Sequence, residues 1–176
     1  SSMSLVQMDK ALTDADVAFD FIGFDACLMS SVETALILGE HADYLIGSEE
    51  SDPGIGWYYT DWLNALSKNA SMSTIEIGKN IADSFVTQCN KQTPGQSATL
   101  SVVDLAELSA TIPSKLSAYS NATTDLIKTD FKTVSSARSG SREFAQSAYT
   151  DLVDLVDMAS SIGTKEANEL VENLGL

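Results

Sequence analysis

The sequence predicts an α/β fold in which helices cover both faces of a mostly parallel sheet. Three apolar runs rich in β-forming residues alternate with segments of helical periodicity, which is the pattern of β-α-β units. The chain has 176 residues, of which 44% are hydrophobic, and this suffices for one domain with its own core. Because three strands are few for this length, we expect either further strands in the second half or a sheet that another segment completes.

The first half of the chain opens with a short helix, and two strands follow. In the range 3–12, Leu5, Met8 and Leu12 recur at the spacing of an amphipathic helix. Apolar, β-rich runs lie at 17–24 and 42–48, and the first is typical of a strand buried in a parallel sheet.

Between these two strands the sequence predicts a helix. Ser30 and Glu33 match the pattern S-x-x-E, which predicts a capping box at the helix start. Val32, Ala35 and Leu36 then fall on one face of that helix, as expected for a helix packed on a sheet.

An acidic loop at 49–56, punctuated by proline and glycine, follows the second strand. An aromatic-rich helix is expected at 57–69. A further helix opens at the capping box of Ser73 with Glu76 and leads to a third strand at 98–105.

Beyond the third strand the pattern is helical. We expect breaks at Pro113, around Asn121 and at 139–140. The ranges 149–162 and 165–174 have the periodicity of the last two helices.

The charge balance narrows the classes of partner. The net charge is −15 and the isoelectric point is about 4.1, so the surface repels nucleic-acid phosphate and anionic membranes. No apolar run approaches the roughly 20 residues that span a bilayer. We therefore expect neither nucleic acid nor membrane as a partner. The acidity favours basic peptides as partners, or it serves solubility alone.

Only two cysteines and one histidine are present, namely Cys27, Cys89 and His41. No CxxC pattern occurs, so a zinc site is not expected. A disulfide between the two cysteines is possible on count alone. If Cys27 is a nucleophile it must be free, and Cys89 is then a small buried apolar residue.

Cys27 follows the first predicted strand and precedes the predicted helix. A helix N-terminus favours thiolate over thiol, and the backbone N–H of Cys27 could donate to a developing oxyanion. Asp25 lies two residues earlier, so in extended chain both side chains point the same way. Asp25 could pair with a cationic substrate group or cap the following turn, and Cys27 could equally be a core residue.

The segments GFDACLMSSVETA and ADYLIGSEESDPGIGWYYTDWL closely resemble the clostripain family of cysteine peptidases, a member of the caspase-like clan. The resemblance covers residues 19–62 and rests on the DAC triplet, the SEE strand end and the PG-x-GW loop. It implies a caspase-like α/β/α sandwich and a thiol protease that cleaves peptides after Arg or Lys. It also implies a hydrolase that bacteria secrete to an extracellular or periplasmic location and that matures by autoprocessing.

The resemblance assigns roles to particular residues. It makes Cys27 the nucleophile and Asp25 the acid that binds the basic P1 side chain. Glu49, Glu50 and Asp52 follow the second strand and are further candidates for the wall of the P1 pocket.

The histidine departs from the family pattern, in which a His-Gly pair precedes the cysteine. Here His41 follows Cys27 at the far end of a helix of about ten residues, or about 15 Å. We therefore expect the base on a companion chain of an internally cleaved precursor. Residues 1–176 would then be part of a single caspase-like peptidase domain, after the cleavage site and without its histidine segment. The alternative is a non-catalytic homologue that acts as a binding or interaction module.

No cofactor is required for this chemistry, and no metal ligand is assigned. Calcium is possible because the resemblance implies it for some family members. Asp151, Asp154 and Asp157 share one face of the predicted helix, which favours a solvated acidic face over a calcium loop.

Overall fold

The computed structural model describes residues 3–145 and 151–174 and divides the chain into two compact units, Ser1–Leu108 and Ser109–Leu176. That residues 1–176 form part of one peptidase domain stays a prediction. In the described ranges no helix combines the length and the apolar character needed to cross a bilayer.

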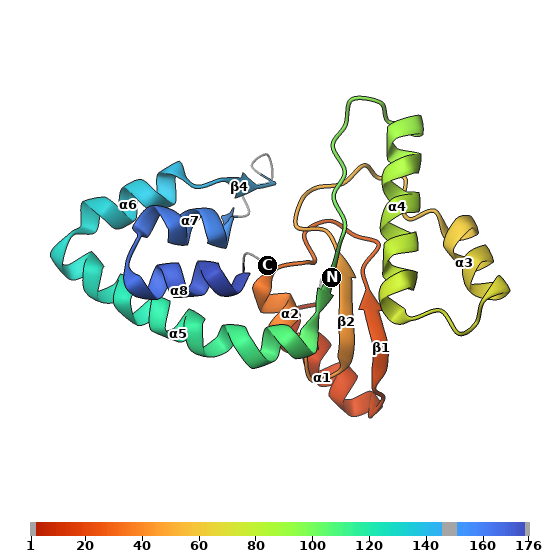
Figure 1. Ribbon diagram of the computed structural model, residues 1–176, viewed down its shortest axis with the longest axis horizontal. Coiled ribbons are helices and arrows are strands. Elements are labelled where there is room, and N and C mark those ends of the chain that lie inside the picture. The colour runs from red at the N-terminus through yellow and green to blue at the C-terminus, as the bar shows by residue number, and fades with distance from the viewer. Residues whose placement is uncertain (1–2, 146–150, 175–176) are drawn as a thin grey trace. The chain divides into compact units, whose positions relative to one another are not determined.

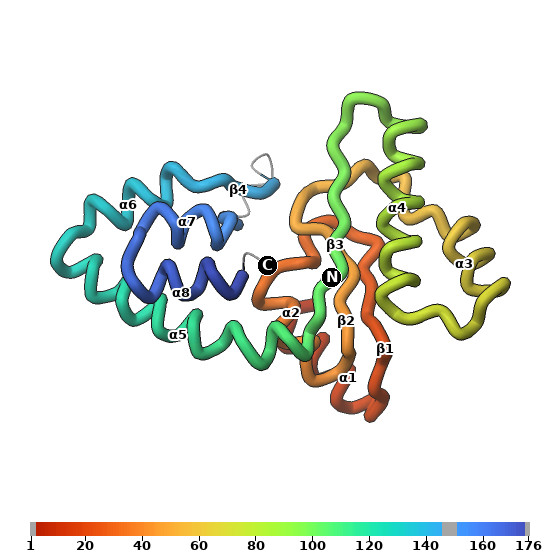
Figure 2. Tube along the Cα trace, in the orientation of Figure 1, coloured from red at the N-terminus to blue at the C-terminus, as the bar shows by residue number. Residues whose placement is uncertain are grey.

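The first unit is built on a three-stranded sheet in the order β1-β2-β3 (Figure 1). The strands are β1 (Phe19–Gly23), β2 (Ala42–Gly47) and β3 (Ser101–Asp104). The predicted parallel pairing holds for β1 and β2, whereas β3 runs antiparallel to β2. Two helices separate β2 from β3, so the chain returns to the end of the sheet that it left and β3 descends beside β2 (Figure 2).

Helices pack on both faces of this sheet and make an α/β/α sandwich. One face carries α1 (Leu5–Ala15) and α2 (Val32–Leu38). The other carries α4 (Thr74–Gln92), and α3 (Tyr59–Lys68) packs against α4 farther from the strands, as Figure 1 shows. The predicted fold class is confirmed in this unit.

Alternation along the strands divides the core between the two faces. In β2, Leu45 and Ile46 are both fully buried but point to opposite sides, because successive strand residues alternate. Leu45 packs with Leu38 of α2, and Ile46 packs with Ile81 and Phe85 of α4. Both faces of β2 are therefore buried at its end, whereas the first strand, for which burial was predicted, is exposed or half-buried along its length.

The start of α2 differs from the prediction. Ser31, not Ser30, is the N-cap, and its hydroxyl accepts from the Thr34 N–H at 3.2 Å, so the predicted Ser30–Glu33 capping box is wrong. The Ser30 N–H instead donates to the Ser48 carbonyl at 3.0 Å, which ties Ser30 to the end of β2. The predicted box of Ser73 with Glu76 is confirmed at the start of α4.

The second unit is mainly helical. It contains the greater part of α5 (Leu105–Thr129), then α6 (Phe131–Gly140), α7 (Leu155–Ile162) and α8 (Lys165–Leu174). Two short antiparallel strands, β4 (Glu143–Phe144) and β5 (Leu152–Val153), pair with each other.

The predicted breaks in this unit are only partly correct. The helix α5 continues through Pro113 and Asn121, where breaks were expected, and ends before Asp130, which caps α6. The break at 139–140 is confirmed by the end of α6. The predicted helix at 149–162 begins only at Leu155, and its residues 149–150 lie outside the described residues.

Gly78 lets α4 approach the sheet, and its substitution tests this packing. A Cβ built on Gly78 would lie 2.7 Å from Cγ2 of Val102 in β3. Overpacking of this kind costs about 1–3 kcal/mol, more than the ~1 kcal/mol that alanine gains over glycine in a helix. Gly78→Ala should therefore lower the free energy of unfolding measured by urea denaturation. Gly54→Ala is the control, because no heavy atom lies within 4 Å of its built Cβ. Equal stability of the two variants would contradict the tight packing.

Candidate active site

The candidate site lies where the segments that follow β1 and β2 come together. Because β1 and β2 are parallel, their carboxyl ends meet at one edge of the sheet, the usual ligand edge of α/β sheets. Three backbone hydrogen bonds join these two segments beyond the strands; the first continues the parallel register, and the other two come from chain that has turned back along the end of β2. The N–H groups of Phe24, Leu28 and Ser30 donate to the carbonyls of Ile46, Glu50 and Ser48 at 2.9, 3.3 and 3.0 Å.

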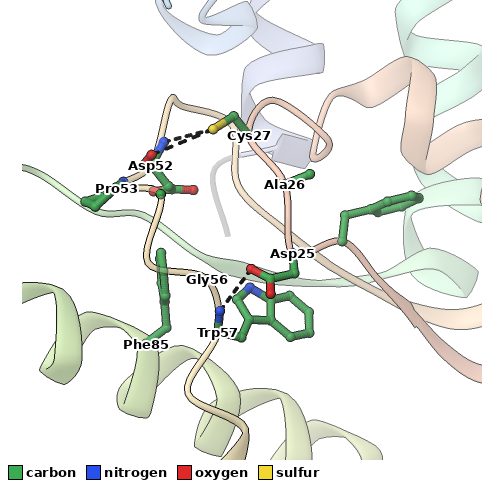
Figure 3. A pocket seen from close by; sticks show the side chains of 10 residues that line it. Asp25, Ala26, Cys27, Asp52, Pro53, Gly56, Trp57 and Phe85 are labelled. Carbon is green, nitrogen blue, oxygen red and sulfur yellow. Dashed lines mark hydrogen bonds between the residues drawn. The ribbon is translucent and has the colours of Figure 1, made fainter. Parts of the chain in front are cut away.

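A pocket opens between these two segments, and Figure 3 shows the side chains that line it. Asp25, Ala26 and Cys27 come from the segment after β1, and Asp52 to Trp57 come from the segment after β2. Phe85 of α4 closes the apolar side. The pocket lies wholly within the first unit.

Cys27 is exposed in this pocket and forms no disulfide. Its Sγ accepts a hydrogen bond from the Asp52 N–H at 3.3 Å, and the Asp52 carbonyl oxygen lies 3.8 Å away (Figure 3). Among the described residues, the Cys27 N–H donates no hydrogen bond, so it is available to an incoming oxygen.

The predicted position of Cys27 at a helix N-terminus is wrong. The helix α2 begins at Val32 with Ser31 as its cap, and a loop separates Cys27 from that cap. The field of a helix terminus falls off within its first turn, so α2 is not what stabilises a thiolate here. Leu28 follows Cys27 with φ 62°, the left-handed conformation, which turns the chain back toward β2.

Asp25 bridges the two segments of the pocket. One carboxylate oxygen, Oδ1, accepts from the Trp57 N–H at 2.9 Å, and Oδ2 accepts from the Tyr59 hydroxyl at 3.2 Å. Gly56 has φ 71°, and a Cβ built on it would lie 3.1 Å from Asp25 Oδ2, so a side chain there would crowd the carboxylate. Asp25 therefore binds the opposite segment and does not cap its own turn.

The Asp25 carboxylate is exposed and keeps capacity for a cation. A carboxylate has about four acceptor positions, and the two bonds described here use one on each oxygen. The remaining positions suit the paired N–H groups of a guanidinium or a single ammonium.

Tyr59 is a site residue that sequence reasoning missed. Partial burial of its hydroxyl, followed by the negative charge and hydrogen bond of Asp25, raises the pKa of Tyr59. The hydroxyl therefore remains a donor to Asp25 throughout the neutral range. The available signal was the aromatic-rich segment after the acidic loop, for which the sequence predicted only a helix.

The other predicted acids divide into two groups. Asp52 lines the pocket, and its Oδ1 accepts from the Thr99 N–H at 2.9 Å. Glu49 and Glu50 are not part of the lining. The Glu49 carboxylate accepts from the Ser101 hydroxyl at 2.7 Å, and that of Glu50 accepts from the Ser51 N–H at 2.7 Å.

His41 lies at the opposite end of the sheet, as its sequence position predicts. Its carbonyl accepts from the N–H of Phe19, the first residue of β1, at 2.9 Å. Its Nε2 forms a 2.8 Å hydrogen bond with the Asp9 carboxylate of α1, and the residue is buried. The single histidine of the chain is therefore not placed to act on Cys27.

In the described part of the chain, no group of three or more His, Cys, Asp or Glu side chains is placed to hold a metal ion. The three aspartates of the predicted acidic helix face have separate structural roles. Asp151 pairs with Arg138, Asp154 caps α7, and Asp157 accepts from the Arg142 N–H at 2.8 Å.

Comparison with models of known protein families shows to which family the chain belongs. A family model described as the clostripain family, peptidase group C11, matches residues 1–173. The chain belongs to the clostripain family. No match was found among curated proteins.

Solved structures agree with this membership. A cysteine protease of B. fragilis is 22% identical with a TM-score of 0.63, and the match covers 99% of this chain and 71% of that one. A secreted C11 cysteine protease from Bacteroides thetaiotaomicron, in complex with an irreversible peptide inhibitor, is 28% identical with a TM-score of 0.66. An inactive zymogen C11 protease from Parabacteroides distasonis is 25% identical with a TM-score of 0.67.

The chain has the fold of the clostripain-family cysteine proteases but spans only part of the larger ones. The match covers 98% of this chain and 46% of the secreted Bacteroides protease, and 97% of this chain and 45% of the zymogen.

The hydrogen bond of Tyr59 to Asp25 gives a test by titration. Asp25→Asn removes the negative charge beside the hydroxyl and should lower the pKa of Tyr59. Burial, the larger cause, remains, so the pKa should stay above the ordinary tyrosine value of 10.0. Ultraviolet absorbance titration, with a Tyr59→Phe titration subtracted, isolates this tyrosine. Asp61→Asn, an exposed acid in the first turn of α3, is the matched control. An unchanged Tyr59 titration in Asp25→Asn would contradict the bond.

Proposed function

We propose that this chain carries the nucleophile and the P1-binding acid of a cysteine endopeptidase that cleaves after Arg or Lys. The observation that carries the proposal is that the exposed Cys27 thiol and the bridged Asp25 carboxylate line one pocket. Membership of the clostripain family supports the reaction class.

In the proposed mechanism, the Cys27 thiolate attacks the carbonyl carbon after the basic residue. A histidine on another segment takes the thiol proton and returns it to the leaving amine. Water then hydrolyses the thioester and regenerates the thiol. The Cys27 N–H, together with an amide beside that histidine, stabilises the oxyanion.

Asp25 binds the P1 cation in this proposal. Its two structural hydrogen bonds fix the plane of the carboxylate, so a guanidinium or ammonium meets an oriented partner. Asp52 also lines this pocket, while Glu49 and Glu50 contribute to its negative field from outside the lining.

The catalytic histidine comes from a companion segment of the same precursor. The outer edge of β1 has no strand partner among the described residues, so another strand can pair there and complete the sheet. A parallel strand at that edge would bring its carboxyl end beside Cys27. The relative described as an inactive zymogen supports maturation by cleavage, here autoprocessing within a caspase-like domain.

The location and the cofactor requirement complete the proposal. Secretion by a bacterium agrees with the Bacteroides relative described as secreted. The chemistry itself needs no cofactor.

Removal of the nucleophile tests the reaction class. Cys27→Ala, purified with every segment that accompanies the chain, should abolish turnover of Arg-terminated reporter peptides and labelling by an Arg-bearing electrophile. Cys89→Ala is the control, because Cys89 is buried. Residual turnover in Cys27→Ala would refute the role of Cys27 as the nucleophile.

Intact mass and N-terminal sequencing of the same material should reveal a companion peptide with a His-Gly pair. An unlabelled wild-type protein would favour the non-catalytic binding module.

The charge of Asp25 is tested separately. Asp25→Asn keeps the shape and an acceptor for the Trp57 N–H, so folding should be little affected. The kcat/KM for Arg reporters should fall by roughly 100-fold or more, since a charge-assisted pair is worth about 3 kcal/mol. Asp20→Asn, an exposed acid of β1, is the matched control. A stability loss without a selective loss of Arg cleavage would assign Asp25 a purely structural role.

A further inference from the structure

Asp52 presents polar groups to two different partners, and its carbonyl oxygen, 3.8 Å from the Cys27 sulfur, accepts from the thiol when the sulfur is protonated. Its backbone N–H donates to the Cys27 sulfur at 3.3 Å, while its carboxylate accepts from the Thr99 N–H at 2.9 Å. In Figure 3 the amide nitrogen of Asp52 faces the sulfur of Cys27. One residue therefore connects the thiol to the segment that leads into β3.

The amide is a source of thiolate stabilisation that α2 does not supply. An N–H donor to sulfur is stronger when the sulfur is ionised, because the bond is then charge-assisted. Such a donor therefore favours thiolate over thiol. It acts only if the amide is held at the correct distance and direction.

The carboxylate of Asp52 holds its own amide in place. The partner of that carboxylate, Thr99, is itself fixed, because its hydroxyl lies 2.7 Å from the hydroxyl of Ser48. Ser48 is 1% exposed and also donates to the Glu50 carbonyl at 3.2 Å. The segment from Ser48 to Asp52 is thus anchored at both ends to one neighbouring stretch of chain.

We propose that Asp52 is a positioning residue for the nucleophile: its carboxylate, bonded to the Thr99 N–H, fixes the amide that stabilises the Cys27 thiolate. This inference rests on the proposed function and gives Asp52 a role other than binding the P1 cation. What the role requires is a hydrogen-bond acceptor at Oδ1. The negative charge is not required and acts weakly against the thiolate.

Two substitutions separate the acceptor from the charge. Asp52→Asn keeps an acceptor for the Thr99 N–H and removes the charge, whereas Asp52→Ala removes both. The probe is iodoacetamide, a small neutral reagent that needs neither a histidine nor a peptide substrate. Modification at Cys27 is followed at pH 7 by peptide mass mapping. Asp52→Ala should react about tenfold more slowly, as expected for loss of a hydrogen bond to a charged group, and Asp52→Asn should react at the wild-type rate.

The same peptide mapping checks the fold, because Cys89 is 1% exposed and reacts only if the structure opens.

Kinetics with Arg reporters give the second readout. Asp52→Ala should lower kcat with little change in KM, and Asp52→Asn should restore kcat. A wild-type alkylation rate in Asp52→Ala overturns the inference. The inference is also overturned if both variants lose the same factor in alkylation rate. It is overturned as well if the KM for Arg reporters rises equally in both variants, and this result would make Asp52 an acid that binds the P1 cation. If the wild-type protein cleaves no Arg reporter while the alkylation pattern holds, the proposed function fails and the positioning of the thiol stands.

Discussion

The site depends on backbone hydrogen bonding between the segments that follow the parallel strands β1 and β2. Three backbone bonds hold the segment after β1 against the segment after β2, so Asp25 and Cys27 face Asp52 to Trp57. These bonds use main-chain atoms, and the side chains of the loop remain available to the pocket. The bridges from Asp25 to Trp57 and Tyr59 then join the two segments a second time, through side chains.

Much of the first unit could be predicted from the sequence, because its signals are local. The apolar runs marked all three strands, and the box of Ser73 with Glu76 marked the start of α4. Strand direction was not local information. The helical pattern between two strands does not show whether the connection ends at the same end of the sheet or at the opposite one. The sequence therefore predicted a parallel β3, whereas β3 is antiparallel to β2.

The site was harder to predict, because its contacts join residues far apart in sequence. The Ser30–Glu33 pattern suggested a cap, but the Ser30 N–H is drawn to the Ser48 carbonyl, and this pairing delays the helix to Val32. No local pattern reveals that Asp25 binds a tyrosine hydroxyl or that the Asp52 amide meets a sulfur. The remote position of His41 could be predicted from the length of the intervening helix. The family resemblance could be recognised because the residues that make these contacts lie in short sequence motifs.

The outer edge of β1, which has no strand partner among the described residues, also bears on association between copies of the chain. Among the described residues this edge presents main-chain donors and acceptors without a strand partner, and Phe19 at its start is 37% exposed. An open edge of this kind is a template for pairing between copies and thus for aggregation. The exposed Asp20 in the same strand and the net charge of −15 both oppose such self-association. The net charge that argues against nucleic acid as a partner thus also opposes pairing of this edge between copies of the chain.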